Sequence, residues 1–272
     1  MKQSSSVCDP VSGRASSAPC ALHHEIDGPA GAPPLLLGGS LGTSLAMWRP
    51  QLEALAQRFR VIRYDHRGHG DSPVPAGTYR IDDLGRDVLA LLDRLRLDRV
   101  HVAGLSLGGM VAMWLAANAP ERVDRMVLLC TAARLGPSHI WAQRAQTVRA
   151  AGMHAVVGTV VSRWFTPAFA ERHRGVVTWA TRQLTGTPPQ GYAGCCEVIQ
   201  HLDLEPVLGS IAAPTLVVAG ADDQATPPAM IRRIAAAVPR ARMAIVPDAA
   251  HLANIEQPEA VTRLLLDFLG GA

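Results

Sequence analysis

The sequence predicts one large α/β domain, in which a mostly parallel sheet carries helices on both faces and a helical cap is inserted. Apolar runs of strand length alternate with segments of helical period, and one long helical stretch interrupts this alternation. The runs are continuously apolar, as in Thr215–Ala219, which is typical of parallel strands buried on both sides. The chain of 272 residues has room for such a domain.

Each expected strand is an apolar run bounded by polar or turn residues. In chain order the strands are Pro34–Gly38, Arg60–Tyr64, Arg99–Ala103, Arg125–Leu129, Thr215–Ala219 and Ala241–Val246. Between and after these runs, apolar residues recur with a helical period. The expected helices are Leu45–Gln57, Ile81–Leu95, Gly109–Asn118, Pro228–Val238 and Pro258–Leu269.

The alternation stops between about residues 134 and 208, where the pattern is helical and aromatic residues gather. We expect a helical cap at 134–208, inserted into an α/β core made of 21–133 and 209–272. Open α/β sheets bind ligands at the carboxyl ends of their strands, so the cap would roof the site. Residues 1–20 are rich in Ser, Ala and Pro without an apolar signal segment, which predicts a disordered extension.

Composition excludes several classes of protein. The net charge is only +3 and the basic residues are scattered, so no nucleic-acid partner is expected. No uncharged apolar run reaches the roughly 18 residues that span a bilayer, so no membrane segment is expected. The five cysteines match neither a disulfide framework nor a zinc spacing, which favours a reducing cytoplasm. No set of metal ligands recurs at a suitable spacing.

The most informative motif, Gly104-Leu105-Ser106-Leu107-Gly108, joins an apolar strand to an apolar helix. Gly-x-Ser-x-Gly indicates a nucleophilic serine where a strand turns sharply into a helix. The glycines leave room for the strained turn, which holds Ser106 Oγ above the edge of the sheet. A serine in an ordinary tight turn is the alternative, but it gives no comparable reason for both glycines.

A serine nucleophile needs a base, and the base needs a carboxylate to orient it. Loops after the two last strands offer both groups at the same edge of the sheet as the serine. The candidates are Asp222, Asp223, Asp248 and His251. We interpret His251 as the base and Asp223 as the acid, ahead of Asp222 and then Asp248. The chain order Ser, Asp, His is that of the α/β-hydrolases.

Acyl transfer also needs N–H donors aimed at the developing oxyanion, each worth about 2.7–4 kcal/mol. Leu107 N–H, directly after the nucleophile, is one expected donor. The second is expected in the loop of residues 38–43, whose small residues let the backbone approach a substrate. Leu41 N–H is the candidate there, with Gly39 N–H as the alternative.

Several longer segments resemble the 3-oxoadipate enol-lactonases, a family of α/β-hydrolases. The resemblance covers roughly residues 35–269 and is most specific at 187–196 in the cap and at 250–260 around His251. The nucleophile motif and the Arg-Gly-His-Gly sequence at 67–70 occur in many hydrolase families. The family pattern places the acid on Asp223. One departure is Gly38-Gly39, where the family often has Ser-Asn.

The resemblance implies hydrolysis of 3-oxoadipate enol-lactone to 3-oxoadipate in the β-ketoadipate pathway, through an acyl-enzyme and without cofactor or metal. The substrate is a small molecule with a free carboxylate, for which Arg134 is the candidate cation and Trp141 a candidate pocket wall. Alternatives are another capped serine hydrolase (a carboxylesterase, thioesterase or C–C bond hydrolase) and a cofactor-free perhydrolase or haloperoxidase. A catalytically silent binding protein on the same fold is a reading of a different class.

Overall fold

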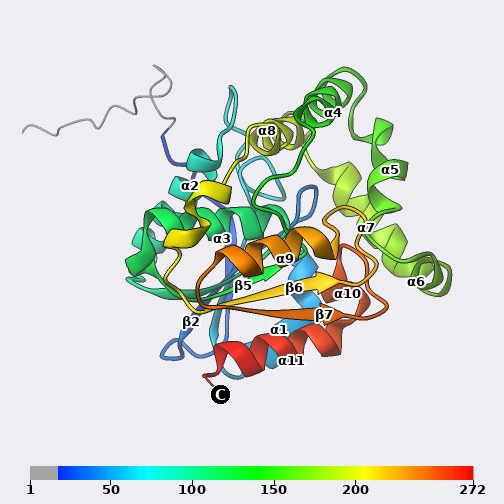
Figure 1. Cartoon of the computed structure of the whole chain (residues 1–272). Coiled ribbons are helices and arrows are strands. Elements are labelled where there is room, and N and C mark those ends of the chain that lie inside the picture. Colours follow the sequence, from blue (N-terminus) through cyan, green and yellow to red (C-terminus); the bar gives the residue numbers. More distant parts are fainter. Residues whose placement is uncertain (1–17, 272) are drawn as a thin grey trace, which may run out of the picture.

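The centre of the computed structural model, which describes residues 18–271, is a seven-stranded sheet (Figure 1). The strands are β1 (His24–Asp27), β2 (Pro34–Gly38), β3 (Arg60–Tyr64), β4 (Val100–Leu105), β5 (Val123–Leu129), β6 (Thr215–Gly220) and β7 (Ala241–Val246). Their order across the sheet is β1-β3-β2-β4-β5-β6-β7, and β1 alone runs antiparallel to its neighbour. The predicted α/β class and mostly parallel sheet are therefore confirmed.

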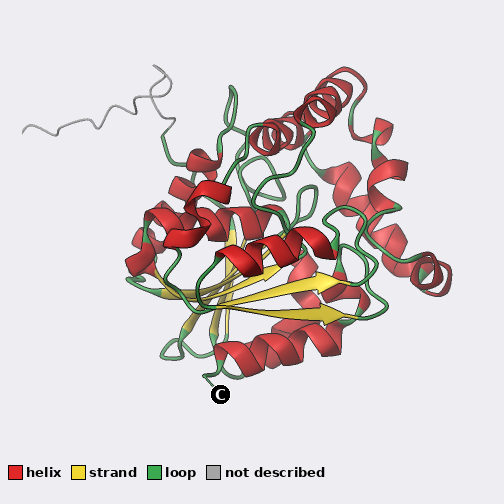
Figure 2. Cartoon of the chain, viewed as in Figure 1, coloured by secondary structure: helices red, strands yellow, loops and turns green. Residues whose placement is uncertain are grey.

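Helices cover both faces of this sheet, as Figure 2 shows. One face carries α2 (Ile81–Arg94), α3 (Leu107–Asn118) and α9 (Pro228–Ala237), and the other carries α1 (Arg49–Ala56) and α11 (Pro258–Leu269) (Figure 1). Short helical turns complete the core: η1 (Leu45–Trp48), η2 (Pro120–Arg122), η4 (Glu205–Ser210) and α10 (Ala253–Glu256). Every residue of β4 and β6 is buried between the two helical layers, which explains their continuous apolar runs.

Two differences from the predicted elements have physical causes. The edge strand β1 (His-Glu-Ile-Asp) has no apolar pattern because its residues are exposed or half-buried. It is held by pairing with β3 and by Arg63, whose guanidinium lies 2.6 Å from Glu25 and 2.9 Å from Asp27. The predicted helix 45–57 divides into η1 and α1 next to Pro50, which has no N–H to continue the hydrogen-bond ladder.

Between β5 and β6 the chain is helical throughout, and we call residues 138–200 the helical segment. It consists of α4 (Ser138–Ala151), η3 (Met153–Ala155), α5 (Val157–Val161), α6 (Pro167–Arg172), α7 (Arg174–Gly186) and α8 (Pro189–Gln200). Its contacts with the core include loops that follow three parallel strands. They are Tyr192 with Gly42 after β2, Gly191 with Gly68 after β3, and Trp164 O with Leu252 N–H after β7. The helical segment therefore lies over the carboxyl ends of the strands.

The division of the chain into domains stays a prediction. Residues 1–17, most of the predicted extension, lie outside the described residues. Its last residue, Cys20, is buried, and its N–H donates to Asp87 Oδ1 at 2.6 Å.

Within residues 18–271, no helix is both long and apolar enough to cross a bilayer.

Candidate active site

Ser106 occupies a strained turn between the end of β4 and the first residue of α3. Its φ of 54° and ψ of −111° lie in a region that residues other than glycine rarely adopt. Two hydrogen bonds hold the turn against the chain around β5. The Ser106 N–H donates to Leu129 O at 2.9 Å, and Thr131 Oγ1 donates to Ser106 O at 2.7 Å. The turn has the geometry that the sequence motif predicts.

Close backbone packing explains both glycines of the motif. A Cβ on Gly104 would meet Gly108 O at 2.2 Å, and a Cβ on Gly108 would meet Gly38 O at 2.3 Å. Such distances are far inside van der Waals contact, so any side chain would push α3 away from β2 and β4. The glycines therefore let α3 start directly behind the serine.

His251 and Asp223 come together from the loops after β7 and β6. His251 Nδ1 lies 2.9 Å from Asp223 Oδ2, and both side chains are almost fully buried. Because a carboxylate accepts hydrogen bonds, Nδ1 carries the proton in the neutral ring, and Nε2 is left as the basic nitrogen. Asp222 and Asp248 are exposed and hold no such position.

Asp223 is surrounded by donors that favour its charged form. Its Oδ1 accepts from Ala225 N–H at 2.8 Å and Thr226 N–H at 2.9 Å, and its Oδ2 accepts from Thr226 Oγ1 at 2.6 Å. Burial alone would raise the Asp223 pKa. The charge and hydrogen bond of His251, together with the Thr226 bonds, outweigh burial and lower the pKa to about 2. Asp223 is therefore a carboxylate at neutral pH.

Ser106 Oγ and His251 Nε2 have no hydrogen-bond partner among residues 18–271, and neither atom is fully enclosed. Both atoms are thus available to a ligand. Hydrogen bonds between nucleophile and base often form only in the substrate complex.

The expected oxyanion donors both have free N–H groups. In the loop after β2, Ser40 N–H donates to Met47 Sδ, Gly42 N–H to His69 Nε2 and Thr43 N–H to Ser40 O. Of residues 40–43 in the described chain, this leaves Leu41 N–H without a partner. Leu107 N–H, at the first position of α3, is also unpaired there. The alternative donor, Gly39, makes its close contacts through its carbonyl.

Two histidines that the sequence analysis leaves without a role hold this loop in place. Gly39 O accepts from His66 Nε2 at 3.0 Å and from Gly108 N–H at 2.9 Å. His69 Nε2 accepts from Gly42 N–H at 3.0 Å. Burial lowers the pKa of His66 to about 3 and that of His69 to about 4, so both rings are neutral at pH 7. The Arg-Gly-His-Gly sequence at 67–70 contains His69 and directly follows His66, but it does not by itself show this role.

The structure does not bring Arg134 to the other expected site residues. Its side chain is 63% exposed, and its guanidinium faces Asp203 at 3.9 Å. It lines a separate cavity of about 360 Å³ with residues of η4 and α9, among them Leu208 and Ile234. A carboxylate clamp at Arg134 therefore has no support from the geometry.

A different arginine, Arg144, faces the interior of the helical segment. Arg144 lies on α4, half-buried, with its guanidinium carbon 4.6 Å from the ring centroid of Trp141 on the same helix. Burial raises the pKa of the Tyr192 hydroxyl, and the positive charge of Arg144 opposes that shift, so the two groups are close. Among residues 18–271, no carboxylate pairs with Arg144.

Tyr192 lies between Arg144 and the loop of residues 38–43, which we call the oxyanion loop. The edge of its ring lies 3.1 Å from the place that a Cβ on Gly42 would occupy, and Gly42 directly follows Leu41. Arg144 therefore lies close to a ring that packs against this loop. Sequence periodicity places Trp141 and Arg144 on a helix, but it does not show which cation points inward.

One group of possible metal ligands exists among residues 18–271: His23, Asp65 and Asp71. Asp65 already accepts from Leu45 N–H at 2.6 Å, from Asp71 N–H at 3.1 Å and from His23 at 2.9 Å. These bonds explain the buried carboxylate as an anchor for the loops after β2 and β3. The group lends no support to a metal site.

A buried carboxylate, Glu256 on α10, joins the His251 loop to the helical segment. Its Oε2 accepts from Ala250 N–H at 2.9 Å, next to His251. Its Oε1 accepts from Thr166 N–H at 3.1 Å and from Thr166 Oγ1. A cavity of about 1080 Å³ lies between α6 and the loops after β6 and β7, so packing alone does not join the helical segment to these loops.

We expect Glu256→Gln to lower kcat about tenfold with little change in KM. The amide turns an acceptor into a donor that faces other donors, which costs about 1–3 kcal/mol and loosens the loop carrying His251. Steady-state kinetics on the lactone that the sequence resemblance implies and a thermal melt measure both effects. Glu259→Gln, at an exposed site on α11, is the matched control and should leave both values unchanged. An unchanged kcat in Glu256→Gln would contradict the positioning role.

Comparisons with known proteins give a consistent result. Residues 33–258 match the family model of the alpha/beta hydrolase fold. 3-oxoadipate enol-lactonase 2 of Acinetobacter baylyi is 40% identical over 240 residues, covering 88% of this chain and 90% of that protein. The enol-lactonase of Burkholderia xenovorans LB400 has a crystal structure that is 43% identical, with a TM-score of 0.90 over 92% of this chain and 97% of that one. RutD of Agrobacterium fabrum, named provisionally as a carbamate hydrolase, is 31% identical over 91% of this chain and 98% of that protein.

Proposed function

The chain belongs to the 3-oxoadipate enol-lactonase family of α/β-hydrolases, and from this membership we propose that it hydrolyses 3-oxoadipate enol-lactone to 3-oxoadipate in the β-ketoadipate pathway. The observation that carries the reaction class is the strained Ser106 turn at the sheet edge where His251 bonds Asp223. This arrangement suits attack by a hydroxyl on an ester carbonyl. The lactone as substrate rests on the similarity to the enol-lactonases.

In the first half of the reaction, His251 Nε2 takes the hydroxyl proton of Ser106 as Oγ attacks the lactone carbonyl carbon. Asp223 keeps the Nδ1 proton in place and stabilises the imidazolium. The N–H groups of Leu41 and Leu107 donate to the oxyanion. Collapse breaks the ring C–O bond, and the enol oxygen leaves with the proton from His251. An enol is a better leaving group than an alkyl alcohol, and it relaxes to the ketone.

In the second half, His251 Nε2 takes a proton from water, and the water oxygen attacks the acyl carbon. Collapse of this second tetrahedral intermediate expels Ser106 Oγ, which recovers its proton from His251. The product carries the new carboxylate and is released as 3-oxoadipate. Only residues of this chain and water take part in these steps.

We propose Arg144, in place of Arg134, as the cation that binds the free carboxylate of the substrate, with Trp141 as part of the pocket wall. Three observations support it: Arg144 is half-buried, it has no carboxylate partner among residues 18–271, and it lies close to Tyr192, whose ring packs against Gly42 of the oxyanion loop. A guanidinium fixes a carboxylate through two parallel hydrogen bonds, which orients as well as attracts the substrate.

Arg144→Ala is expected to lower kcat/KM for the enol-lactone about 10–100-fold, chiefly through KM. A hydrogen bond to a charged group contributes about 1.5–3 kcal/mol, which corresponds to this range. Turnover of p-nitrophenyl acetate, which has no carboxylate, should change less than about threefold. Arg134→Ala is the control and should leave both substrates unaffected. Equal losses on both substrates, or a selective loss in Arg134→Ala, would refute the assignment.

A substrate panel tests the proposed function itself. The enol-lactone, p-nitrophenyl acetate, a thioester and a small carbamate are compared by kcat/KM, and peroxide-dependent halogenation is assayed in acetate buffer. We expect the enol-lactone to be preferred by at least about 100-fold, because it alone uses both the Ser106 turn and the cation. Preference for an uncharged ester, a thioester or a carbamate would overturn the proposal, as would halogenation as the main activity.

We also propose that the protein works in the cytoplasm on a small-molecule lactone, with neither a membrane nor a nucleic acid as partner. The four described cysteines, at positions 20, 130, 195 and 196, are all free and buried, which suits a reducing compartment. The scattered basic residues and the modest net charge of +3 support the absence of a nucleic-acid partner.

A further inference from the structure

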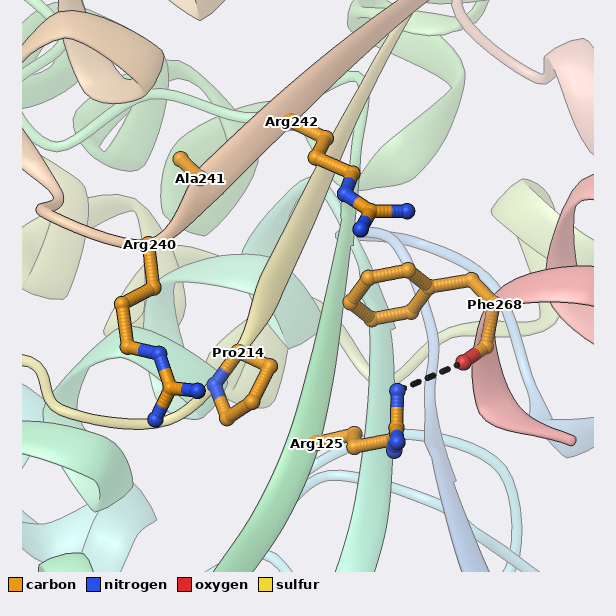
Figure 3. Close-up of a pocket in the computed structure, with 6 residues that line it drawn as sticks. All are labelled: Arg125, Pro214, Arg240, Ala241, Arg242 and Phe268. Atoms are coloured by element: carbon orange, nitrogen blue, oxygen red, sulfur yellow. Dashed lines mark hydrogen bonds between the residues drawn. The ribbon is translucent and has the colours of Figure 1, made fainter. Parts of the chain in front are cut away.

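A further pocket, of about 500 Å³, lies at the end of the sheet where β6 and β7 begin (Figure 3). It is lined by Arg125, Pro214, Arg240, Ala241, Arg242 and Phe268. Arg125 belongs to β5, Arg240 and Arg242 flank the start of β7, and Phe268 lies in the last turn of α11. Figure 3 shows the three guanidinium groups around the pocket, with Phe268 between Arg125 and Arg242.

The charge of this pocket is unbalanced. Three of its six lining residues are arginines and none is acidic. Within residues 18–271, none of the three guanidinium groups forms an ion pair with a carboxylate. Like charges that share one cavity repel each other, and a bound anion would remove that repulsion.

Arg125 is held in a defined position instead of moving freely in solvent. It is half-buried, one of its terminal nitrogens donates to Phe268 O at 3.2 Å, and its guanidinium carbon lies 5.9 Å from the centroid of the Phe268 ring. A guanidinium has five N–H donors, so this single bond leaves several for a ligand. Arg240 and Arg242 are exposed and can close over a ligand from the other sides.

We propose that this pocket binds a small anion with two or more separated negative charges, such as a polycarboxylate or a polyphosphate. Both chemistries present planar or tetrahedral groups of oxygens that arginine binds through paired hydrogen bonds. A monovalent anion would neutralise only one of the three guanidinium groups. The pocket volume is enough for a molecule of about the size of citrate.

The pocket is separate from the Ser106 site. It lies at the amino ends of β6 and β7, whereas Asp223 and His251 follow their carboxyl ends. Strands of six residues span about 20 Å, so the two sites lie on opposite ends of the sheet. Substitutions in the pocket should therefore leave turnover of the enol-lactone unchanged, and binding can be measured without reference to activity.

Isothermal titration at low ionic strength tests the proposal with citrate, pyrophosphate and acetate as probes. We expect saturable binding of citrate or pyrophosphate at one site, and at least tenfold weaker binding of acetate. The stronger of the two multivalent probes distinguishes a polycarboxylate site from a polyphosphate site. The variant Arg240→Gln/Arg242→Gln should weaken that binding at least tenfold while the melting temperature and enol-lactone turnover stay the same.

The control variant Arg174→Gln/Arg182→Gln removes the same charge from exposed positions on α7 and should leave binding unchanged. Absence of saturable binding to the wild type would overturn the proposal. Equal weakening in the pocket variant and the control would also overturn it, because the effect would then come from net charge alone. Binding that Arg240→Gln/Arg242→Gln leaves intact would overturn it as well.

Discussion

Replacing Ser106 with alanine is expected to lower kcat for the enol-lactone about a million-fold, as the loss of a serine nucleophile does in other triads. Alanine removes the attacking oxygen and nothing else, because Ser106 Oγ makes no hydrogen bond to another of residues 18–271. The hydrogen bonds of the Ser106 backbone to Leu129 and Thr131 remain. The variant should therefore fold with an unchanged melting temperature, measured beside its kinetics.

Covalent labelling with a fluorophosphonate distinguishes a serine nucleophile at this turn from a catalytically silent binding protein. The wild type should carry one adduct on Ser106, found by peptide mass spectrometry, and Ser106→Ala should carry none. Ser210→Ala, on the exposed turn η4, is the matched control and should label and turn over as the wild type does. More than about one per cent of wild-type kcat in Ser106→Ala would contradict the nucleophile assignment. A wild type that is not labelled would favour the binding-protein reading.

Asp223→Asn is expected to lower kcat about ten-thousand-fold, the size of effect seen when the orienting carboxylate of a triad becomes an amide. The amide can donate to His251 Nδ1 and so stabilise the tautomer whose proton is on Nε2, which cannot accept a proton from Ser106. Asp222→Asn changes the neighbouring, exposed carboxylate and should keep kcat within about twofold. The reverse result would place the acid on Asp222.

The low Asp223 pKa also predicts how the stabilities of the wild type and of Asp223→Asn change with pH. Its value of about 2 lies below the unfolded value of about 3.9, so ionised Asp223 contributes stability that is full above pH 4 and lost as the pH falls towards 2. The asparagine variant lacks this contribution at every pH. The melting temperature of the wild type should therefore exceed that of Asp223→Asn most at neutral pH, and the gap should narrow between pH 4 and 2. A constant gap would contradict the lowered pKa.

The central parallel strands are predictable from the sequence because strands buried on both faces, such as β4 and β6, are made mostly of apolar residues. β1 has no apolar run because it is an exposed edge strand, held in place by pairing with β3 and by the ion pairs of Arg63. The preference for Asp223 over Asp222 has a plain physical basis in the structure. Asp223 lies buried among four donors, whereas Asp222 is exposed.

The residues that the sequence does not single out act across long separations along the chain. His69 holds Gly42 from 27 positions away, and Glu256 holds Thr166 from 90 positions away. Neither pair has a periodicity or spacing that marks it. The sequence also does not distinguish the roles of Arg134 and Arg144, because both are arginines near the start of the helical segment. The packing of α4 against α8 brings Arg144 close to Tyr192, whereas Arg134 lies before α4 and is exposed, facing Asp203.

The sequence by itself determined the α/β class and pointed to Ser106, His251 and Asp223, because those signals are local. A strand that turns into a helix between two glycines, and polar residues directly after buried strands, are patterns of a few neighbouring residues. The tertiary structure alone decided which N–H groups stay free beside Ser106, which arginine faces the interior, and which carboxylate ties the His251 loop to the helical segment. These depend on contacts between elements far apart in the chain, and such contacts exist only once the sheet and its helices have packed.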